Sequence, residues 1–533
     1  MPRCTINGVE IEVKEGTTII QAMMAHQQRI AHYCWHPGLS VAGVCRLCMV
    51  EIEGNPRLQI ACNTVITEGM KINNTSEKVK EAVKWGLDFH LINHPLDCPI
   101  CDQAGECGLQ EQYMEFGKYD PEMAEPKQKK RKVVDLGPRV VLDSERCILC
   151  SRCVRFTDEV SKSYELGIFN RGDRSEIGTH AGKTLDNKYS LNTVDICPVG
   201  ALTSRDFRFR QRVWYLKDQN TICNGCSTGC HIKVYFNKEG FFRVKPVYNA
   251  EVNGYWMCDE GRDIYRFANK ENRWQQGWYR VDGNIVELKP AELAQKIQSL
   301  VTSQSAFVVT GQFTCEELDR AIGMFVKKVG ASNVFHWQNE PERWNDFDGI
   351  LLRGDRNPNT RGLLEVFQKL QINTHWDQLI QKLQQGMIET LIVAAPEGVT
   401  WYPDFKEKLS IFSKAKNLIW LQSVKRKEVE ELPHKSLYVI PLKSYVEKNG
   451  TFINYAGLRQ SFKAVTTVLH ETLTLDQALG LMLGSWEGLI PVTQNASGVT
   501  ANAMTLVETE RPKDRVLNET RKRNEFIFQR GRL

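Results

Sequence analysis

The distribution of cysteine constrains this chain more than any other feature of its sequence. Sixteen of the seventeen cysteines lie at or before Cys258, and the long remainder of the chain holds only Cys315. Disulfide bonds would suit so many cysteines only in an exported chain, and the N-terminus lacks the basic region and apolar core of an export signal. We therefore expect a soluble protein on the cytosolic side whose metal or redox chemistry is N-terminal.

Length and composition predict several domains. A chain of 533 residues exceeds the usual single domain, and 42% hydrophobic with 25% charged residues is an ordinary soluble composition. No apolar run reaches the ~18 residues that cross a bilayer. The net charge of +5 equals the excess of basic over acidic residues at 511–533. We interpret this segment as a basic tail that is solvated or contacts a partner. No groove-reading motif accompanies the tail, so we predict no nucleic-acid partner.

The first cysteine group follows a predicted hairpin and helix. Asn7-Gly8 lies between alternating apolar residues and indicates a two-residue turn, and Thr17 or Thr18 can cap the helix that follows. The group has the spacing C-x10-C-x2-C-x13-C, which suits a [2Fe–2S] cluster held by a loop and a later strand. Structural zinc is the alternative. The expected ligands are Cys34, Cys45, Cys48 and Cys62.

The second group combines a histidine with three cysteines. Apolar residues recur at helical spacing from Glu77 to Asn93, and Pro95 ends that helix. The motif NHPLDCPICDQAGEC then supplies four ligands within fourteen residues, enough for a [4Fe–4S] cluster. A neutral imidazole in place of a thiolate should raise the reduction potential. The expected ligands are His94, Cys98, Cys101 and Cys107.

The third group has the spacing of a bacterial ferredoxin. RCILCSRCVRF places three cysteines at every third position, and a Cys-Pro pair follows forty-four residues later. We expect a [4Fe–4S] cluster, with zinc as the alternative, on Cys147, Cys150, Cys153 and Cys197. Arginines beside the ligands either offset the negative charge of a cluster or are ordinary surface residues; they are Arg46, Arg146, Arg152 and Arg155.

The fourth group comes from TICNGCSTGC, a predicted hairpin and one later cysteine. A [4Fe–4S] cluster is the prediction and structural zinc the alternative, with Cys223, Cys226, Cys230 and Cys258 as ligands. Only Cys4 and Cys315 remain unassigned, and Cys4 is expected to be a small buried residue of a strand.

These motifs in this order resemble the large iron–sulfur subunit of respiratory complex I, the bacterial NADH–quinone oxidoreductase. GPRVVLDSERCILCSRCVRF and CPVGALTSRDFRFR carry the resemblance together with the His-containing motif, and it covers 1–270. It implies one [2Fe–2S] and three [4Fe–4S] clusters on the four groups. The first three clusters would lie on the electron route from flavin to quinone and the fourth off it.

The resemblance also implies partners and a location. The partners are a flavin-bearing, NADH-oxidising subunit, a small [2Fe–2S] subunit and a two-cluster ferredoxin-like subunit. Contact with the membrane would be only through partners, on the cytoplasmic side of the bacterial inner membrane.

The second half of the chain is predicted to be α/β. SAFVVTG, CEELDRAIGMFVKKVG and ASNVFHW follow a strand–helix–strand order, and DGILLRG, ETLIVAAP and KNLIWLQ are further buried-strand candidates. This half looks like the molybdopterin-oxidoreductase domain that the family retains without its cofactor. SYVEKNGTFINYAGLRQ is expected to contain a Gly turn between strands. Cys315 opens a helix and is expected to cap or pack rather than bind molybdenum, so no molybdopterin is expected.

The predicted fold class is multidomain α+β and α/β. A [2Fe–2S] ferredoxin-like β-grasp at 1–77 precedes a [4Fe–4S] domain with one histidine and three cysteine ligands at 78–137 and a [4Fe–4S] ferredoxin-like domain at 138–212. A four-cysteine [4Fe–4S] domain of molybdopterin-oxidoreductase type at 213–275, a truncated α/β scaffold at 276–510 and the basic tail at 511–533 follow.

Electron relay towards quinone is the predicted function, as a subunit of proton-translocating NADH:quinone oxidoreductase. The chain presents no acid, base or nucleophile for catalysis, and no G-x-G-x-x-G loop indicates an NADH or flavin site. The alternative is a catalytic or electron-transfer subunit of an NAD-linked formate dehydrogenase or hydrogenase. Iron-only hydrogenase is excluded because its active cluster needs several C-terminal cysteines, and a zinc scaffold fails on the ferredoxin spacing.

Overall fold

The computed structural model describes four stretches of the chain, and the predicted basic tail at 511–533 lies outside them. The described residues are 1–118, 126–281, 283–398 and 401–485. None of the helices in these stretches has both the length and the apolar composition needed to cross a membrane.

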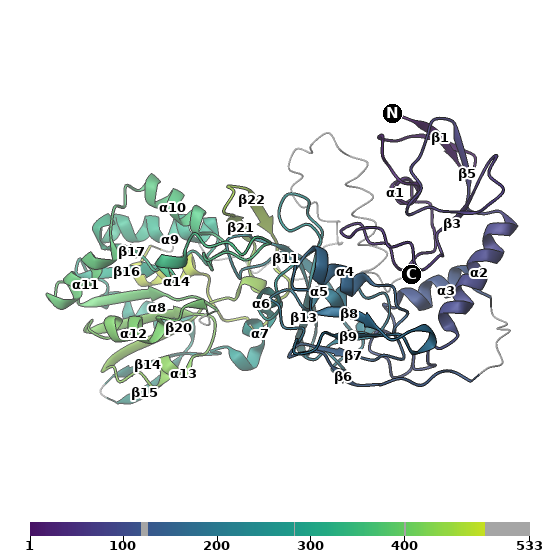
Figure 1. The fold of residues 1–533 in the computed structure, drawn as a ribbon. Coiled ribbons are helices and arrows are strands. Elements are labelled where there is room, and N and C mark those ends of the chain that lie inside the picture. Colours follow the sequence, from purple (N-terminus) through teal and green to yellow (C-terminus); the bar gives the residue numbers. More distant parts are fainter. Residues whose placement is uncertain (119–125, 282, 399–400, 486–533) are drawn as a thin grey trace, which may run out of the picture. The chain divides into compact units, whose positions relative to one another are not determined.

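The backbone divides into two compact units, both drawn in Figure 1. The cysteine-rich unit comprises Met1–Lys217 and Val247–Asp259. The α/β unit comprises Asp218–Pro246 and the described residues from Glu260 onward. Each unit has a hydrophobic core of its own.

The N-terminal sheet begins with the predicted hairpin. Asn7 and Gly8 have φ angles of 49° and 83°, the left-handed pair that a two-residue hairpin turn requires. Thr18 precedes α1 (Ile19–Ala25), and the Gln21 side chain accepts a hydrogen bond from the Thr18 N–H at 2.9 Å, as in a capping box. The sheet order is β2-β1-β5-β3-β4, with β1 at Arg3–Ile6, β2 at Val9–Glu12, β3 at Met49–Ile52, β4 at Gln59–Ile60 and β5 at Met70–Asn73. Cys4 is buried in β1, as expected.

Helix α2 (Glu77–Leu91) confirms the helical pattern before the second group. The Ser76 hydroxyl accepts a hydrogen bond from the Val79 N–H at 3.3 Å, and Val79, Val83 and Leu87 are buried on one face. Two small sheets, β10-β7-β6 and β8-β9, complete the cysteine-rich unit with three helices. The elements are α3 Gly108–Phe116, α4 Arg152–Glu159, α5 Asn192–Asp195, β6 Val134–Asp135, β7 Val140–Leu142, β8 Leu166–Phe169, β9 Glu176–Thr179 and β10 Leu202–Ser204.

The α/β unit is built on a seven-stranded sheet of order β15-β14-β20-β19-β18-β16-β17. The last five strands of that order are mutually parallel, which confirms the predicted βαβ arrangement, and β14 and β15 pair antiparallel at one edge. The strands are β14 Gly277–Val281, β15 Asn284–Leu288, β16 Ser305–Val309, β17 Val334–His336, β18 Thr390–Ala394, β19 Asn417–Gln422 and β20 Ser436–Pro441. The longer helices are α8 Pro290–Lys296, α9 Cys315–Lys328, α10 Thr360–Lys369, α11 Trp376–Gln384, α12 Phe405–Phe412 and α14 Leu475–Leu483, with the short α6 Asp259–Arg262, α7 Tyr265–Ala268 and α13 Lys427–Glu430.

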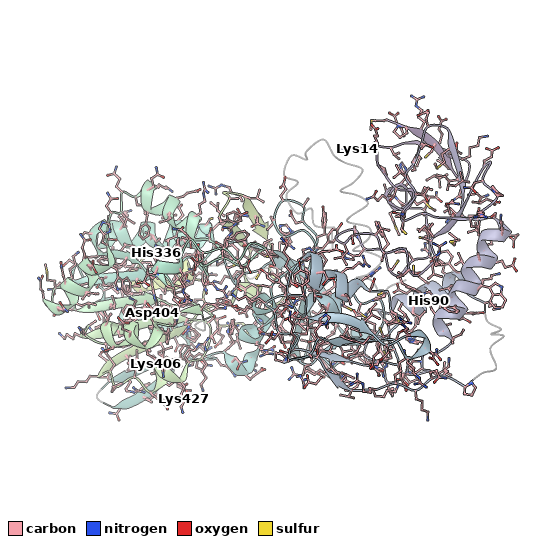
Figure 2. The ribbon with its side chains drawn as sticks, in the orientation of Figure 1. Lys14, His90, His336, Asp404, Lys406 and Lys427 are labelled. Carbon is pink, nitrogen blue, oxygen red and sulfur yellow. The ribbon has the colours of Figure 1, made fainter. Side chains whose placement is uncertain are left out.

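Both faces of this sheet are buried. Ile419 and Leu421 of β19 pack with residues of α8, α9, α10 and α14. Trp420, between them, joins an aromatic cluster with Trp337 and Phe412. Because both faces are covered, the middle of a parallel strand is apolar without alternation, as at 418–421 of β19. His336, labelled in Figure 2, ends β17, and burial lowers its pKa to about 4, so its ring is neutral.

Two smaller sheets also follow the sequence patterns. Strands β11 (Lys217–Ile222), β12 (His231–Asn237) and β13 (Gly240–Pro246) include the predicted hairpin. Strands β21 (Gly450–Ile453) and β22 (Arg459–Phe462) flank the expected Gly turn, in which Gly457 has φ 86°. Cys315 begins α9 after the cap residue Thr314, as predicted.

One strand prediction was wrong. DGILLRG, at 348–354, forms an irregular loop rather than a buried strand. The Asp348 carboxylate accepts the backbone N–H groups of Ile350, Leu351 and Leu352 at 3.0–3.1 Å, and these donors are thereby removed from any sheet ladder. Gly349, at φ 85°, turns the chain in the same loop.

Candidate iron–sulfur centres

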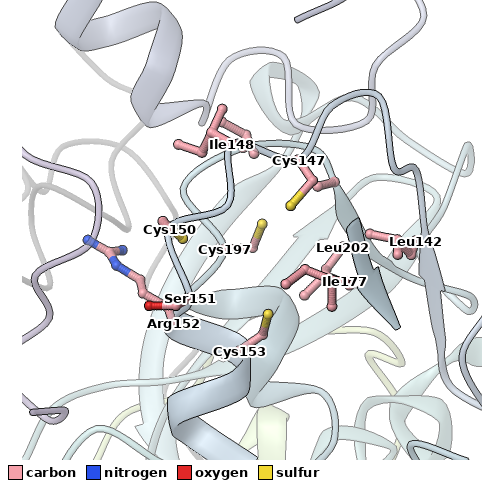
Figure 3. Close-up of a pocket in the computed structure, with 12 residues that line it drawn as sticks. Leu142, Cys147, Ile148, Cys150, Ser151, Arg152, Cys153, Ile177, Cys197 and Leu202 are labelled. Carbon is pink, nitrogen blue, oxygen red and sulfur yellow. The ribbon is translucent and has the colours of Figure 1, made fainter. Parts of the chain in front are cut away.

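The third cysteine group converges on one small pocket (Figure 3). The sulfur atoms of Cys147, Cys150, Cys153 and Cys197 face one another across it, whereas the Arg152 side chain is directed away. Four soft donors enclosed by hydrocarbon suit a [4Fe–4S] cluster, so the residues present fit the predicted group. The wall is formed by Leu142, Ile148, Ile177, Val199, Ala201 and Leu202.

Backbone N–H groups face the sulfurs of this group. The Leu149 N–H donates to the Cys147 sulfur at 3.4 Å. Other N–H groups donate from Arg152 to Cys150, from Val154 to Cys153 and from Leu202 to Cys197. Burial raises the pKa of Cys147 to about 12, and its N–H donor opposes that rise. Donors aimed at sulfur stabilise the thiolate, the form that binds metal.

The loop of the third group needs unusual backbone angles. Leu149 and Ser151 have φ of 55° and 60°, and Arg46 in the loop of the first group has 54°. Each of these left-handed residues lies between two neighbouring cysteines of its group, where the chain has to turn within a few residues.

The first group is buried as two pairs. Cys34 and Cys45 share a side-chain hydrogen bond, and Cys48 and Cys62 share another. The bond from Cys45 lowers the pKa of Cys34 to about 5, and the charge of Cys34 acts in turn on Cys48. All four are at most 5% exposed. The structure thus brings the four predicted ligands of the [2Fe–2S] cluster together.

The second group is more open to solvent. Cys101 and Cys107 are buried, whereas Cys98 is exposed. Burial raises the pKa of Cys107 to about 12, and the charges of Cys101 and Cys98 add to the rise. The three cysteines are therefore neighbours in space as well as in sequence.

One ring nitrogen of His94 has the surroundings expected of a metal ligand. Its Nδ1 is buried and has no hydrogen-bond partner. Burial lowers the pKa of His94 to about 4, with Lys127 and Arg146 acting in the same direction. The ring is then neutral at physiological pH, which is the metal-binding form. Its place as the fourth ligand of this group stays a prediction.

The second and third groups are in contact. The Gly108 N–H donates to the Pro198 carbonyl at 2.9 Å, next to Cys197. A side-chain Cβ at Gly200 would lie 2.2 Å from the Cys101 sulfur. Glycine at this position therefore lets the segment after Cys197 approach the second group.

Tyr33 lies between the first and second groups. Its N–H donates to the Cys45 sulfur at 3.4 Å, and its hydroxyl is buried without a hydrogen-bond partner. Burial raises its pKa, and the charges of Cys107 and Cys45 add to that effect. His90, on α2 and labelled in Figure 2, packs edge-on against the Tyr33 ring at 5.2 Å. One hydrophobic core includes cysteines of three groups, namely Cys34, Cys45, Cys107, Cys150 and Cys153.

The fourth group is divided between the two units. Cys223, Cys226 and Cys230 belong to the α/β unit, where the Cys223 N–H donates to the Cys230 carbonyl at 2.8 Å. Cys258 belongs to the cysteine-rich unit, where the adjacent Asp259 accepts the Ser190 hydroxyl at 2.6 Å. The four cysteines as one site therefore stay a prediction.

Zinc was the alternative for three of the groups. In the described ranges, no three His, Cys, Asp or Glu side chains lie as close together as the ligands of a single metal ion. Metal analysis distinguishes iron from zinc directly.

The arginines beside the ligands differ in burial. Arg152 and Arg146 are 0% and 4% exposed, whereas Arg46 is exposed and Arg155 is partly exposed. Arg146 forms ion pairs with Asp97 and Asp143. Sequence reasoning left the role of these arginines open and missed Tyr33, since neither residue type has a spacing that marks it as part of a metal site.

Four family models match the chain in the predicted order. They are the 2Fe-2S iron-sulfur cluster binding domain at 3–77, the NADH-ubiquinone oxidoreductase-G iron-sulfur binding region at 86–121, the ferredoxin-like domain of NADH-quinone oxidoreductase subunit 3 at 137–203 and the molybdopterin oxidoreductase Fe4S4 domain at 216–270. The fold and these matches define the class, a protein with [2Fe–2S]- and [4Fe–4S]-binding domains.

The curated relatives confirm the resemblance to the large iron–sulfur subunit of complex I. The NADH-quinone oxidoreductase G subunit of Rickettsia typhi is 35% identical over 338 residues, 62% of this chain and 50% of that protein. The corresponding G subunit of Streptomyces coelicolor is 38% identical over 55% of this chain and 35% of that protein. The mitochondrial NADH dehydrogenase [ubiquinone] iron-sulfur protein 1 of Solanum tuberosum is 35% identical over 62% of this chain and 45% of that protein. The chain thus spans about half, or less, of the length of these relatives.

A solved structure of an NAD+-reducing [NiFe]-hydrogenase in the H2-reduced state also matches. It is 30% identical and covers 40% of this chain and 91% of that chain, with a TM-score of 0.37.

Proposed function

We propose that this chain is an iron–sulfur electron-relay subunit of an NADH–quinone oxidoreductase. The observation that carries the proposal is the single hydrophobic core to which cysteines of the first three groups contribute. Bound clusters would supply one-electron redox chemistry at these groups. The chain itself supplies thiolate ligands, backbone donors to sulfur and an apolar surround that excludes water.

The proposed cofactors are one [2Fe–2S] cluster and three [4Fe–4S] clusters. The groups that begin at Cys34, His94, Cys147 and Cys223 would hold them in chain order, with the ligands and domain boundaries given above. The chain would bind neither NADH nor quinone. The α/β half would serve as a scaffold without molybdopterin.

The proposed partners are those of the peripheral arm of complex I. A flavin-bearing, NADH-oxidising subunit and a small [2Fe–2S] subunit would stand on the donor side. A two-cluster ferredoxin-like subunit would accept electrons towards quinone. The chain would act on the cytoplasmic side of the bacterial inner membrane and reach the membrane only through its partners.

Elemental analysis of the anaerobically purified chain tests this proposal. One two-iron and three four-iron clusters predict about 14 irons per chain, with no molybdenum and no zinc. About ten irons would keep the relay but leave one four-iron group without its cluster. Zinc in place of iron would contradict the proposal, and one molybdenum per chain would favour the formate dehydrogenase alternative.

Replacement of His94 by cysteine tests its proposed role as a ligand. The variant should keep a [4Fe–4S] cluster but lower its reduction potential, because a thiolate adds negative charge where a neutral imidazole has none. Redox titration monitored by electron paramagnetic resonance measures the midpoint. The control His90→Gln, one helical turn earlier, should leave that midpoint unchanged. An unchanged midpoint in His94→Cys would remove His94 from the ligand set.

A further inference from the structure

Helix α4 begins inside the third cysteine group and reaches the loop of the first. Arg152, Arg155 and Glu159 follow the i, i+3, i+7 spacing that places side chains on one helix face. Arg155 donates to the carbonyls of Cys34 and Ser40, and Glu159 accepts the Ser40 N–H at 2.8 Å. One short helix therefore holds two ligand loops that are more than a hundred residues apart in the sequence.

Arg152 makes the most direct of these connections. One guanidinium nitrogen donates to the Trp35 carbonyl at 2.5 Å, directly after Cys34. The other donates to the Ile196 carbonyl at 3.0 Å, directly before Cys197. A single side chain thus binds the backbone neighbours of two ligands from different groups.

Arg152 also brings a positive charge into the interior. The side chain is 0% exposed. An arginine guanidinium keeps its positive charge in proteins. In the interior, water and salt screen that charge far less than they screen a surface charge.

We propose that Arg152 is a positioning residue that fixes the first and third cysteine groups to each other and raises the reduction potential of both clusters. This inference rests on the proposed function. Reduction adds negative charge to a cluster, so a nearby buried cation stabilises the reduced form more than the oxidised form. The fork of donors suits this task because a planar guanidinium can satisfy two carbonyls at once, whereas a lysine ammonium is a flexible point charge.

Redox titration of the full chain, monitored by electron paramagnetic resonance, tests the inference. In Arg152→Gln the ratio of reduced to oxidised cluster at a fixed potential should fall about tenfold for both clusters, a shift of about 59 mV for a one-electron couple. Arg152→Lys keeps the charge and should recover most of both midpoints. Because lysine lacks the fork, the magnetic coupling between the two reduced clusters should still change in that variant.

Arg57→Gln is the matched control. Arg57 belongs to the same cysteine-rich unit but is exposed and is not next to a ligand, so removing its charge should leave both midpoints unchanged. Midpoints in Arg152→Gln equal to those of the control would overturn the inference, and so would a shift confined to one cluster.

A second variant covers the case in which Arg152→Gln does not fold. Arg155→Gln removes donors to the Cys34 and Cys150 carbonyls from a partly exposed position, and it should lower both midpoints by a smaller factor. Unchanged midpoints in Arg155→Gln would reject the inference that side chains of α4 connect the two cysteine groups. Absence of either cluster signal in the wild-type chain would reject the proposed function itself, whereas wild-type signals with unmoved variants would reject only this inference.

Discussion

Replacement of Cys197 by alanine should remove about four irons from the chain and leave about ten in place. Cys197 is the remote member of the third group, and its sulfur completes the pocket formed by the other three cysteines (Figure 3). Alanine supplies no ligand, and its smaller side chain fits the same space. The first group has separate ligands, of which Cys48 and Cys62 lie in the core of the N-terminal sheet. It should therefore keep its irons. Iron analysis and loss of one [4Fe–4S] resonance signal measure the effect.

Cys315→Ala is the matched control for this experiment. The Cys315 sulfur is partly buried in the α/β unit and donates weakly to the Asn359 side chain at 3.4 Å. Its removal should leave all the irons in place. Equal iron contents in the two variants would contradict the assignment of Cys197 as a ligand.

Replacement of Trp337 by alanine should destabilise the α/β unit by about 3–5 kcal/mol. The indole is 0% exposed, stacks on Phe405 with ring centroids 5.9 Å apart and meets Phe412 edge-on. The cavity left by its removal cannot be refilled by rigid aromatic neighbours. Denaturant unfolding measures the loss, and metal analysis of the folded variant should still find the irons of the first three groups.

Leu364→Ala gives the baseline for that measurement. Leu364 lies on α10 and is 49% exposed, so its truncation should change the free energy of unfolding by at most about 0.5 kcal/mol. Equal losses in the two variants would show that the aromatic cluster adds no stability. Iron lost from the first three groups together with Trp337 would contradict the independence of the two cores.

Local features of the fold were predictable because short-range chemistry fixes them. The turn at Asn7-Gly8 follows from the φ angles that those residues tolerate, and the start of α1 follows from the cap at Thr18. The same reasoning gave a wrong prediction for DGILLRG. Its three apolar residues fit a buried strand, but the Asp348 carboxylate competes successfully for their backbone donors.

The candidate site could be predicted only where the spacing of residues along the sequence indicates a set of metal ligands. The cysteines of the third group converge because three of them share one loop. A single sequence motif contains the whole of that loop. Arg152 gave no comparable signal, since its carbonyl partners at Trp35 and Ile196 lie 117 and 44 residues away. The position of Tyr33 likewise depends on tertiary packing, and no motif in the sequence indicates it.

The left-handed residues of the cysteine loops have a consequence for the life of the chain before iron arrives. Leu149, Ser151 and Arg46 hold conformations that cost an L-residue about 1–2 kcal/mol each. Packing and hydrogen bonds, such as that from the Leu149 N–H to the Cys147 sulfur, oppose their return to ordinary turns. In a newly made chain these contacts alone would have to hold the strained loops until iron is delivered. A bound cluster would then add its ligand bonds to the same task.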